Sequence, residues 1–317
     1  MYNAEQKTSF LKSYTQSIST ARVATTVFNA FEPYETAWGA DLSTRSKEEL
    51  QPVLEKVLGL RTSSQGMSLT ILREYVKWCL LTKTPDACDA MLHTEVLGLS
   101  KIRRQMVSSP LHLQKSLDEV FESENENTID ITYRCYYWMA FAGIYESDTL
   151  SVKNSDINFT EMEINYRDTH VPIYREALPT FHKAVELQSF IYIHPNYNNK
   201  IWRNRIPGDT IMRGVRAETR ILAIRAVTSR TFAAALDSGK TTHQLSFRRA
   251  WMSGLFYRMY ERERAGLPVD FTEAAVEFAD HGDLLNRSRS ISRNTFIANK
   301  KKEYMEDYQR WKIAFSI

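Results

Sequence analysis

The sequence has little glycine, proline or cysteine, with 11 Gly, 9 Pro and 3 Cys among its 317 residues. So few helix breakers, together with long segments of helical period, predict a mainly helical chain. The cysteines Cys79, Cys88 and Cys135 are odd in number and lack CxxC spacing, which predicts reduced structural thiols. No stretch reaches the roughly 18 apolar residues of a membrane helix, and the N-terminus lacks the apolar core of a signal peptide. We therefore expect a cytoplasmic protein without a membrane partner.

The familiar enzyme motifs are also missing from the sequence. It contains no glycine-rich phosphate loop, no HExxH, no GxSxG and no paired Cys/His spacing typical of a metal site. The 7 histidines are scattered along the chain, and each alone is more typical of a structural role. The sequence thus predicts no metal and no cofactor.

Charge is balanced overall but unevenly distributed. The formal net charge is +3, yet residues 114–199 hold 6 basic against 14 acidic side chains. Residues 200–264 hold 14 basic against 5 acidic side chains, and residues 287–317 hold 8 against 3. A basic half in a near-neutral chain is typical of a nucleic-acid binder with one binding face. An ordinary solvated surface with clustered charges is the alternative.

Apolar periodicity predicts a helical N-terminal domain over residues 1–85, followed by a connector at 86–108. Residues 5–38 carry apolar side chains at helical spacing, and the capping box Ser46-x-x-Glu49 opens a helix that runs to Gly59. Residues 67–82 form an apolar helix whose polar side chains share one face because they lie three or four residues apart.

A second domain, residues 109–317, is predicted to mix helices with a small β-sheet. Ser109-Pro110 is typical of a helix start, and residues 129–142 are apolar enough for a core helix. Short alternating segments between residues 151 and 174 predict two or three strands. Helices are then expected at 179–190, 219–236, 246–264, 271–280 and from 292 onward, with an irregular basic stretch at 191–219. The fold class is mainly α with a small β-sheet (α+β).

Several boxes of this second domain follow one another in a specific order. They are Phe141-Ala-Gly-Ile-Tyr145 with the downstream Asp156-Ile157, the strand end His170-Val-Pro-Ile173, Leu245-Ser-Phe-Arg248-Arg249-Ala-Trp251, Ala275-Val-Glu-Phe-Ala-Asp-His281, and Arg293-Asn-Thr-Phe296. This order resembles the tyrosine recombinases, or phage integrases. The resemblance spans nearly the whole chain and implies a helical core-binding (SAM-like) N-terminal domain before a recombinase catalytic-type domain.

The sequence departs from that family where the chemistry lies. Recombinases surround a DNA phosphate with two arginines, a lysine and histidines while a tyrosine attacks it. Tyr145 stands at the first arginine's position, and no lysine lies in the strands around Arg167. In the frame that keeps Arg248, Leu245 replaces the histidine, whereas a frame starting at His243 loses the arginine at Ser246.

The third box and the nucleophile position complete the comparison. His281 remains in place, but Phe296 stands where the nucleophilic tyrosine is expected and has no hydroxyl. The catalytic positions Tyr145, Leu245, Arg248, His281 and Phe296 are therefore degenerate, and no enzyme activity is expected. The emptied site is expected to be filled as core, with a pocket for a small effector as the alternative.

Recombinases hold DNA between their two domains as in a clamp. The resemblance therefore implies that a chain that keeps both domains but lacks the catalytic residues would still bind double-stranded DNA. The predicted contacts are Arg61, Ser64, Thr70, Arg73, Lys77, Arg203, Arg205, Arg230, Arg248, Arg249 and Arg293. The chain also resembles recombinase-fold repressors that maintain phage lysogeny, which implies a transcriptional repressor in the bacterial cytoplasm. A homo-oligomer through Tyr304, Tyr308 and Trp311 of the terminal helix would fit that role. Two alternatives remain: a divergent active recombinase using Tyr304 or Tyr308, and an architectural or accessory DNA-binding factor.

Overall fold

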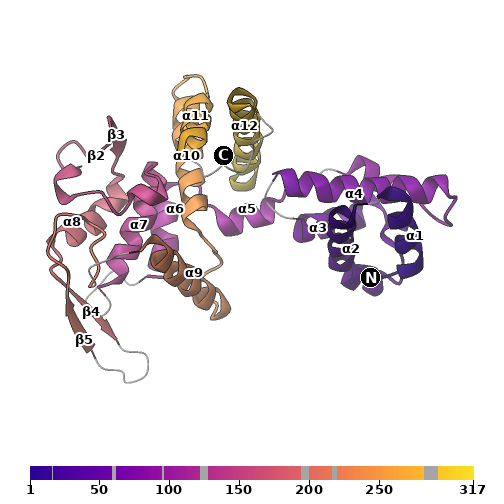
Figure 1. Ribbon diagram of the computed structural model, residues 1–317, viewed down its shortest axis with the longest axis horizontal. Helices are drawn as coiled ribbons and strands as arrows, with labels where there is room; N and C mark the ends of the chain where they lie inside the picture. The colour runs from indigo at the N-terminus through magenta and orange to yellow at the C-terminus, as the bar shows by residue number, and fades with distance from the viewer. Residues whose placement is uncertain are drawn as a thin grey trace. The chain divides into compact units, whose positions relative to one another are not determined.

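The computed structural model describes residues 1–15, 17–58, 62–94, 96–121, 128–193, 200–215, 220–281 and 292–317. The chain divides into two compact units, one of residues 1–102 and 279–317 and one of residues 103–278. Figure 1 shows the elements of both along the chain. Helices α5 (Leu99–Gln105) and α11 (Thr272–His281) span the boundaries between the units.

The first unit is helical. Its elements are α1 (Ala4–Tyr14), α2 (Ile18–Trp38), η1 (Leu42–Thr44), α3 (Lys47–Val57), α4 (Thr62–Leu81), η2 (Ala90–His93) and α12 (Arg293–Phe315). The predicted capping box is present, since Ser46 Oγ accepts from the amide of Glu49 and the Glu49 side chain accepts from that of Ser46. Edge-to-face rings of Phe10, Phe28 and Tyr75 join α1, α2 and α4 in the core.

An ion pair lies inside this helical core. Lys7 and Glu35 are both 0% exposed, and Lys7 Nζ lies 2.6 Å from Glu35 Oε1. Glu35 Oε1 also accepts from the amide of Leu42 at 2.9 Å, and Asp41 Oδ2 lies 3.6 Å from Nζ. Burial raises the pKa of Glu35 although Lys7 and these hydrogen bonds oppose the rise. The pair fixes the start of α1 to the end of α2, which the sequence did not predict.

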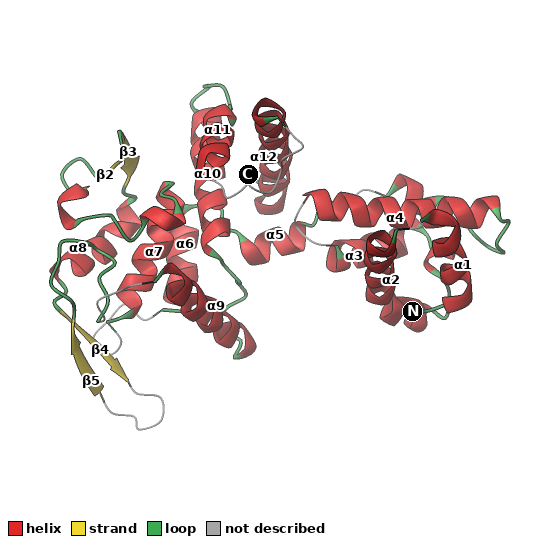
Figure 2. Ribbon diagram, in the orientation of Figure 1, coloured by secondary structure: helices red, strands yellow, loops and turns green. Residues whose placement is uncertain are grey.

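The second unit combines helices with two small sheets. Its elements are α6 (Pro110–Asp118), α7 (Asp130–Ala142), η3 (Glu146–Asp148), η4 (Asn154–Asp156), β1 (Ile157–Asn158), β2 (Glu163–Tyr166), β3 (Thr169–Pro172), η5 (Arg175–Ala177), α8 (Leu178–Glu186), β4 (Ser189–Ile193), β5 (Lys200–Asn204), α9 (Ile221–Asp237) and α10 (Phe247–Arg264). Strands β1-β2-β3 form one antiparallel sheet and β4-β5 a second one (Figure 2). The expected fold class, mainly α with small β-sheets, is confirmed.

Helices α7 and α10 form the centre of this unit. α7 is buried along almost its whole length, as its apolar sequence predicts. Gly254 lets α10 approach α7 closely, because a Cβ at Gly254 would lie 1.8 Å from the carbonyl oxygen of Phe141. Arg258 donates to the same carbonyl at 2.7 Å, and Trp251 Nε1 donates to the carbonyl of Gly143 at 3.0 Å. α10 therefore holds the C-terminal end of α7, where the first recombinase-like box begins.

Two expectations about local structure differ from the observed one. The stretch 191–219 was expected to be irregular, but residues 189–193 and 200–204 pair as β4 and β5, with Phe190 opposite Arg203. Neither five-residue strand, SFIYI or KIWRN, alternates apolar with polar side chains, so the sequence shows no strand pattern there. The helical spacing over residues 5–38 is divided between two helices, because Ser17 caps a new one by accepting from the amide of Thr20.

The observed units also divide the chain differently from the predicted domains. The sequence placed the terminal helix in a domain of residues 109–317, whereas residues 279–317 group with residues 1–102. A domain boundary predicted from composition divides the sequence into continuous segments. It therefore cannot show that a C-terminal segment groups with the first unit.

Candidate functional site

Tyr145 lies in the turn that follows α7. The helix ends at Gly143, whose φ of 115° suits glycine and turns the chain toward η3. The Tyr145 ring packs on that of Trp251, with centroids 5.5 Å apart, and its hydroxyl lies 3.4 Å from Glu277 Oε2. Its backbone amide donates to the hydroxyl of Tyr166 at 3.3 Å. Tyr145, which the sequence resemblance predicts to stand at the first arginine's position, is thus part of a small aromatic cluster.

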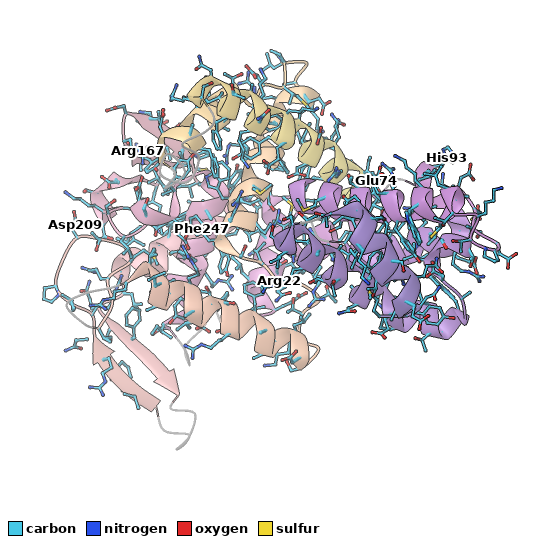
Figure 3. The ribbon with its side chains drawn as sticks, turned by 45° about the vertical axis from the view of Figure 1, so that its right-hand side comes forward. Arg22, Glu74, His93, Arg167, Asp209 and Phe247 are labelled. Atoms are coloured by element: carbon cyan, nitrogen blue, oxygen red, sulfur yellow. The ribbon has the colours of Figure 1, made fainter. Side chains whose placement is uncertain are left out.

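Arg167, labelled in Figure 3, lies at the turn between β2 and β3. This position corresponds to the strands in which recombinases carry a lysine. Arg167 has a φ of 55°, its Nε donates to Asp148 Oδ2 at 3.1 Å, and its guanidinium lies 5.7 Å from the Tyr145 ring centre. The hairpin therefore supplies a cation to the site, but that cation is bound by an acid of the same unit.

Asp148 is the acceptor that organises this cluster. Tyr166 Oη donates to Asp148 Oδ2 at 2.5 Å, and Ser147 Oγ donates to Asp148 Oδ1 at 2.9 Å. Burial alone would raise the pKa of Asp148, but the hydrogen bonds from Tyr166, Ser147 and Arg167 outweigh it and lower that pKa. The carboxylate stays ionised at neutral pH and neutralises the charge of Arg167.

The second box is arranged around the start of α10. Leu245 is 3% exposed, and its carbonyl accepts from Tyr137 Oη at 3.2 Å. α10 begins at Phe247, labelled in Figure 3, after the capping residue Ser246. Arg248 is exposed and lies over the ring of Phe278, with its Cζ 5.4 Å from the ring centre. Arg248 is thus available at the surface of its unit.

Trp251 is the α10 residue that packs on the Tyr145 ring, whereas Arg248 lies over Phe278. It is 7% exposed and lies three residues after Arg248, one helical turn further along α10. The sequence comparison named Trp251 only as the end of the second box. Its i,i+3 spacing from Arg248 was the one indication that both residues share a face.

A cavity of about 350 Å³ lies at the start of α10, within the second unit. Its walls include Leu245, Phe247 and Tyr136 together with Arg225 and Arg249. Tyr136 and Arg225 both donate to Glu146, and Arg225 Nε lies 3.0 Å from Glu146 Oε1. Of the positions predicted to be degenerate, Leu245 is thus buried, whereas Tyr145 is half-buried.

The remaining positions predicted to be degenerate, His281 and Phe296, belong to the first unit. The side chain of His281 lies outside the described residues, while Phe296 on α12 is half-buried. Tyr304, Tyr308 and Trp311 are 1%, 0% and 0% exposed, and Lys300 Nζ lies 4.7 Å above the Tyr304 ring centre. Because one chain already covers these rings, a neighbouring subunit would contact them only if α12 were exchanged between subunits.

The predicted DNA contacts of the first unit follow α4. Arg61 and the side chain of Ser64 lie outside the described residues, and Thr70 is exposed. Arg73 Nη2 donates to the carbonyl of Thr94 at 2.8 Å, so this side chain also fastens the segment that follows the domain. Lys77 is 52% exposed and pairs with Glu74 at 2.7 Å. Such an exposed pair is weak enough to exchange for a phosphate.

The predicted DNA contacts of the second unit, and Arg293 of the first unit, differ in how exposed they are and in what they bind. Arg203, Arg230 and Arg248 are exposed, and Arg249 is half-buried. Arg293 is 47% exposed and pairs with Asp280 at 2.7 Å. Arg205 is 6% exposed and donates to the carbonyl oxygens of Ala184, Leu187, Ile211 and Arg213. Arg205 therefore links the end of α8 to residues 211–213 inside the unit. Its burial does not support the predicted DNA contact.

His243, the start of the alternative second-box frame, forms a pair with His112. Their Nε2 atoms are 3.2 Å apart, and His112 Nδ1 accepts from the amide of Ser108 at 3.2 Å. Burial lowers the pKa of His112 to about 4, with further contributions from His243 and Lys115, against which Glu119 acts. Burial likewise lowers the pKa of His243. Within the described residues, no cluster of three or more His, Cys, Asp or Glu side chains could hold a metal ion.

This pair predicts acid sensitivity of the fold. The unfolded chain protonates His112 near its ordinary pKa of about 6.5, while the folded chain resists protonation until about pH 4. The contribution of His112 to the free energy of unfolding should therefore be fully present above about pH 7 and be lost as the pH drops from 6.5 toward 4. Urea unfolding of wild type and His112→Gln across this range tests it. The variant should lose less stability over the window, and equal slopes for the two proteins would contradict the prediction.

Comparison with known proteins identifies the first part of the chain. Residues 1–81 match the family model described as MrpR, N-terminal core-binding domain. Among solved structures, the integrase from mycobacterium phage Brujita matches with a TM-score of 0.31 and 12% identity, over 97% of this chain and 91% of that chain. A TM-score that low carries no argument here. No curated protein matches the chain.

The family match and the observed architecture together define a class. A core-binding domain at residues 1–81 precedes a mainly helical unit with small antiparallel sheets, which is a recombinase-like or integrase-like fold. The expected resemblance to recombinases is thereby confirmed at the level of the fold, through the core-binding match at residues 1–81. In the described part of the chain, no helix is long and apolar enough to cross a membrane.

Proposed function

We propose that this protein is a sequence-specific binder of double-stranded DNA that has lost recombinase chemistry and acts as a transcriptional repressor controlling phage lysogeny. The match of residues 1–81 to the core-binding domain of MrpR supports DNA binding most directly. The aromatic pair of Tyr145 and Trp251 supports the loss of chemistry, because it lies where a phosphate-binding arginine would be needed.

The alternative of an active recombinase finds little support. Tyr304 and Tyr308 would have to supply the nucleophile in place of Phe296, yet both rings are buried, at 1% and 0% exposed. Arg167, which would have to act for the family's lysine, is bound by Asp148. An architectural or accessory role would retain DNA binding but lose sequence preference and add bending, which the experiment below distinguishes.

The test is binding of the purified full chain to fragments of its own source genome, on native and denaturing gels at two salt concentrations. We expect discrete fragments to shift, the shift to weaken steeply with salt, and no band to survive denaturation. A surviving band would mean a covalent bond and an active enzyme. Equal shifts of all fragments would favour the architectural role, and no shift at low salt would exclude DNA binding.

The exposed arginines predict a graded loss of affinity. Replacing Arg230 or Arg248 with alanine should weaken operator binding roughly tenfold each, because each removes about one phosphate contact. The slope of log affinity against log salt should fall by about 1 per substitution. Arg22→Ala is the matched control, since Arg22 is exposed on α2 and is not a predicted contact. Equal effects of all three substitutions would point to net charge alone.

A further inference from the structure

Two guanidinium groups lie together in the segment that follows β5. Arg205 is buried and bound to backbone carbonyl oxygens, among them that of Arg213 at 3.3 Å from its Nε. Burial and then the nearby Arg213 lower the pKa of Arg205 to about 10, so it remains charged at neutral pH. Neither arginine forms an ion pair with an acid of the described residues. The segment therefore holds two positive charges that lack an anion.

Arg213 is the less satisfied of the two. Its Nη1 donates to the carbonyl of Gly208, but its Nε and Nη2 are buried and have no acceptor among the described residues. It is the only described residue with two buried side-chain atoms in this state. Nε and Nη2 form one edge of the guanidinium, which is the fork that binds both oxygens of a carboxylate. A charged donor left in this way is costly, so the edge calls for an acceptor.

A cavity of about 190 Å³ adjoins this arginine inside the second unit. Its walls are mainly apolar and come from α7, β4, residues 212–215 and the start of α9. They include Ile129, Tyr133, Phe190, Met212, Ile224 and Val227, with Arg213 and Arg220 among the polar members. The volume is somewhat larger than a cavity of roughly 150 Å³ that holds benzene. The space thus suits one ring or a short branched chain.

We propose that this cavity binds a small apolar monocarboxylate, with the carboxylate on the Nε–Nη2 edge of Arg213 and the apolar body against Phe190, Met212 and Ile224. Because the Nε–Nη2 edge is closed to solvent in the ligand-free chain, the proposal requires the half-buried Arg213 side chain to turn toward the cavity on binding. A phosphate fits less well, since its additional oxygens would meet apolar walls and not donors. Neutral apolar molecules would fill the space but leave the fork unpaired.

The position of the cavity suggests what the ligand would regulate. Ala223, Ile224 and Val227 of its wall belong to α9, and Arg230 of the same helix is a predicted DNA contact. A ligand that wedges against the start of α9 would shift Arg230 and alter operator affinity. This regulatory step rests on the proposed function, whereas ligand binding itself does not.

The experiment is calorimetric titration of the DNA-free full chain with benzoate, 4-methylpentanoate, benzamide and inorganic phosphate. We expect at least one of the two carboxylates to bind, and benzamide and phosphate to bind about tenfold more weakly or not at all. Arg213→Met keeps the length of the side chain but removes the fork, and it should weaken carboxylate binding about tenfold or more. Absence of binding by both carboxylates would overturn the proposal.

Further variants separate the site from a fault in folding and from DNA binding. Ala223→Phe fills the cavity from an exposed position and should abolish binding while leaving the circular dichroism spectrum unchanged. Carboxylate binding that survives both variants would place the ligand elsewhere and refute this site. If Arg213→Met instead lowers the salt slope of DNA binding by about 1 and no carboxylate binds, Arg213 holds a DNA phosphate and the proposal fails. DNA binding that fails while benzoate binds would overturn the proposed function and leave the ligand site standing.

Discussion

Replacing Gly254 with alanine is expected to destabilise the second unit by about 3–5 kcal/mol or to prevent its folding. The added Cβ would lie 1.8 Å from the carbonyl oxygen of Phe141 and 2.6 Å from its carbonyl carbon, and both are backbone atoms. α7 and α10 would have to separate, which would also break the hydrogen bond from Arg258 to Phe141. Urea unfolding followed by circular dichroism measures the loss.

Gly66 provides the control for this substitution. It lies inside α4, where an added Cβ would meet no atom within 4 Å. Gly66→Ala should therefore stabilise the protein by about 0.5–1 kcal/mol, since alanine loses less backbone entropy than glycine in a helix. A Gly254→Ala variant as stable as wild type would mean that α7 and α10 are not as closely packed as described.

The second large effect is expected at the buried ion pair of the first unit. Lys7→Met should cost about 3–5 kcal/mol, because it leaves the carboxylate of Glu35 in a core where both side chains are 0% exposed. The double variant Lys7→Met/Glu35→Leu should recover most of that stability, since Glu35 is then gone and the remaining buried carboxylate, Asp41, still accepts from Tyr75 Oη and the amide of Ser43. Chemical unfolding of the four proteins of this cycle gives the coupling between the two residues.

Lys12→Met tests whether the loss of a lysine from α1 is harmful in itself. Lys12 is exposed on the same helix, so its replacement should change stability by less than about 0.5 kcal/mol. If the double variant is as unstable as Lys7→Met, the lysine contributes through packing and not by neutralising Glu35. Asp41, which lies 3.6 Å from Lys7 Nζ, keeps its own bond from Tyr75 Oη at 2.9 Å in either case.

Local features of this chain could be predicted from its sequence because they depend on neighbouring residues. The capping box at Ser46, the helix start at Pro110 and the buried helix α7 are set by spacings within one segment. The order of the recombinase-like boxes also predicted the fold, because that order constrains several helices and strands at once. The polar face of α4 was also visible, since Thr70, Arg73 and Lys77 repeat at helical spacing.

Features that depend on distant residues could not be predicted in this way. Arg205 resembles a DNA-binding arginine in a basic stretch, but carbonyl oxygens of the α8 end and of residues 211–213 bind it inside the fold. The partnership of Tyr145 with Trp251 joins residues more than a hundred positions apart. The hairpin of β4 and β5 was missed because its strands pair only with each other and carry polar as well as apolar residues.

The stacking of Tyr145 on Trp251 also bears on how such a chain evolves. Under the proposed function, an arginine at position 145 alone would bring a second guanidinium beside Arg167, where Asp148 is already bound by Arg167 and Tyr166. Glu277, which lies 3.4 Å from the Tyr145 hydroxyl, would compete with a DNA phosphate for that guanidinium. The indole of Trp251 would still occupy the neighbouring space, and Phe296 would still lack a hydroxyl. Under the proposed function none of these changes alone restores cutting, so selection has no intermediate to favour. Under the proposed function the loss of DNA cutting is difficult to reverse. Descendants would diversify through their DNA-binding surfaces instead of regaining the recombinase reaction.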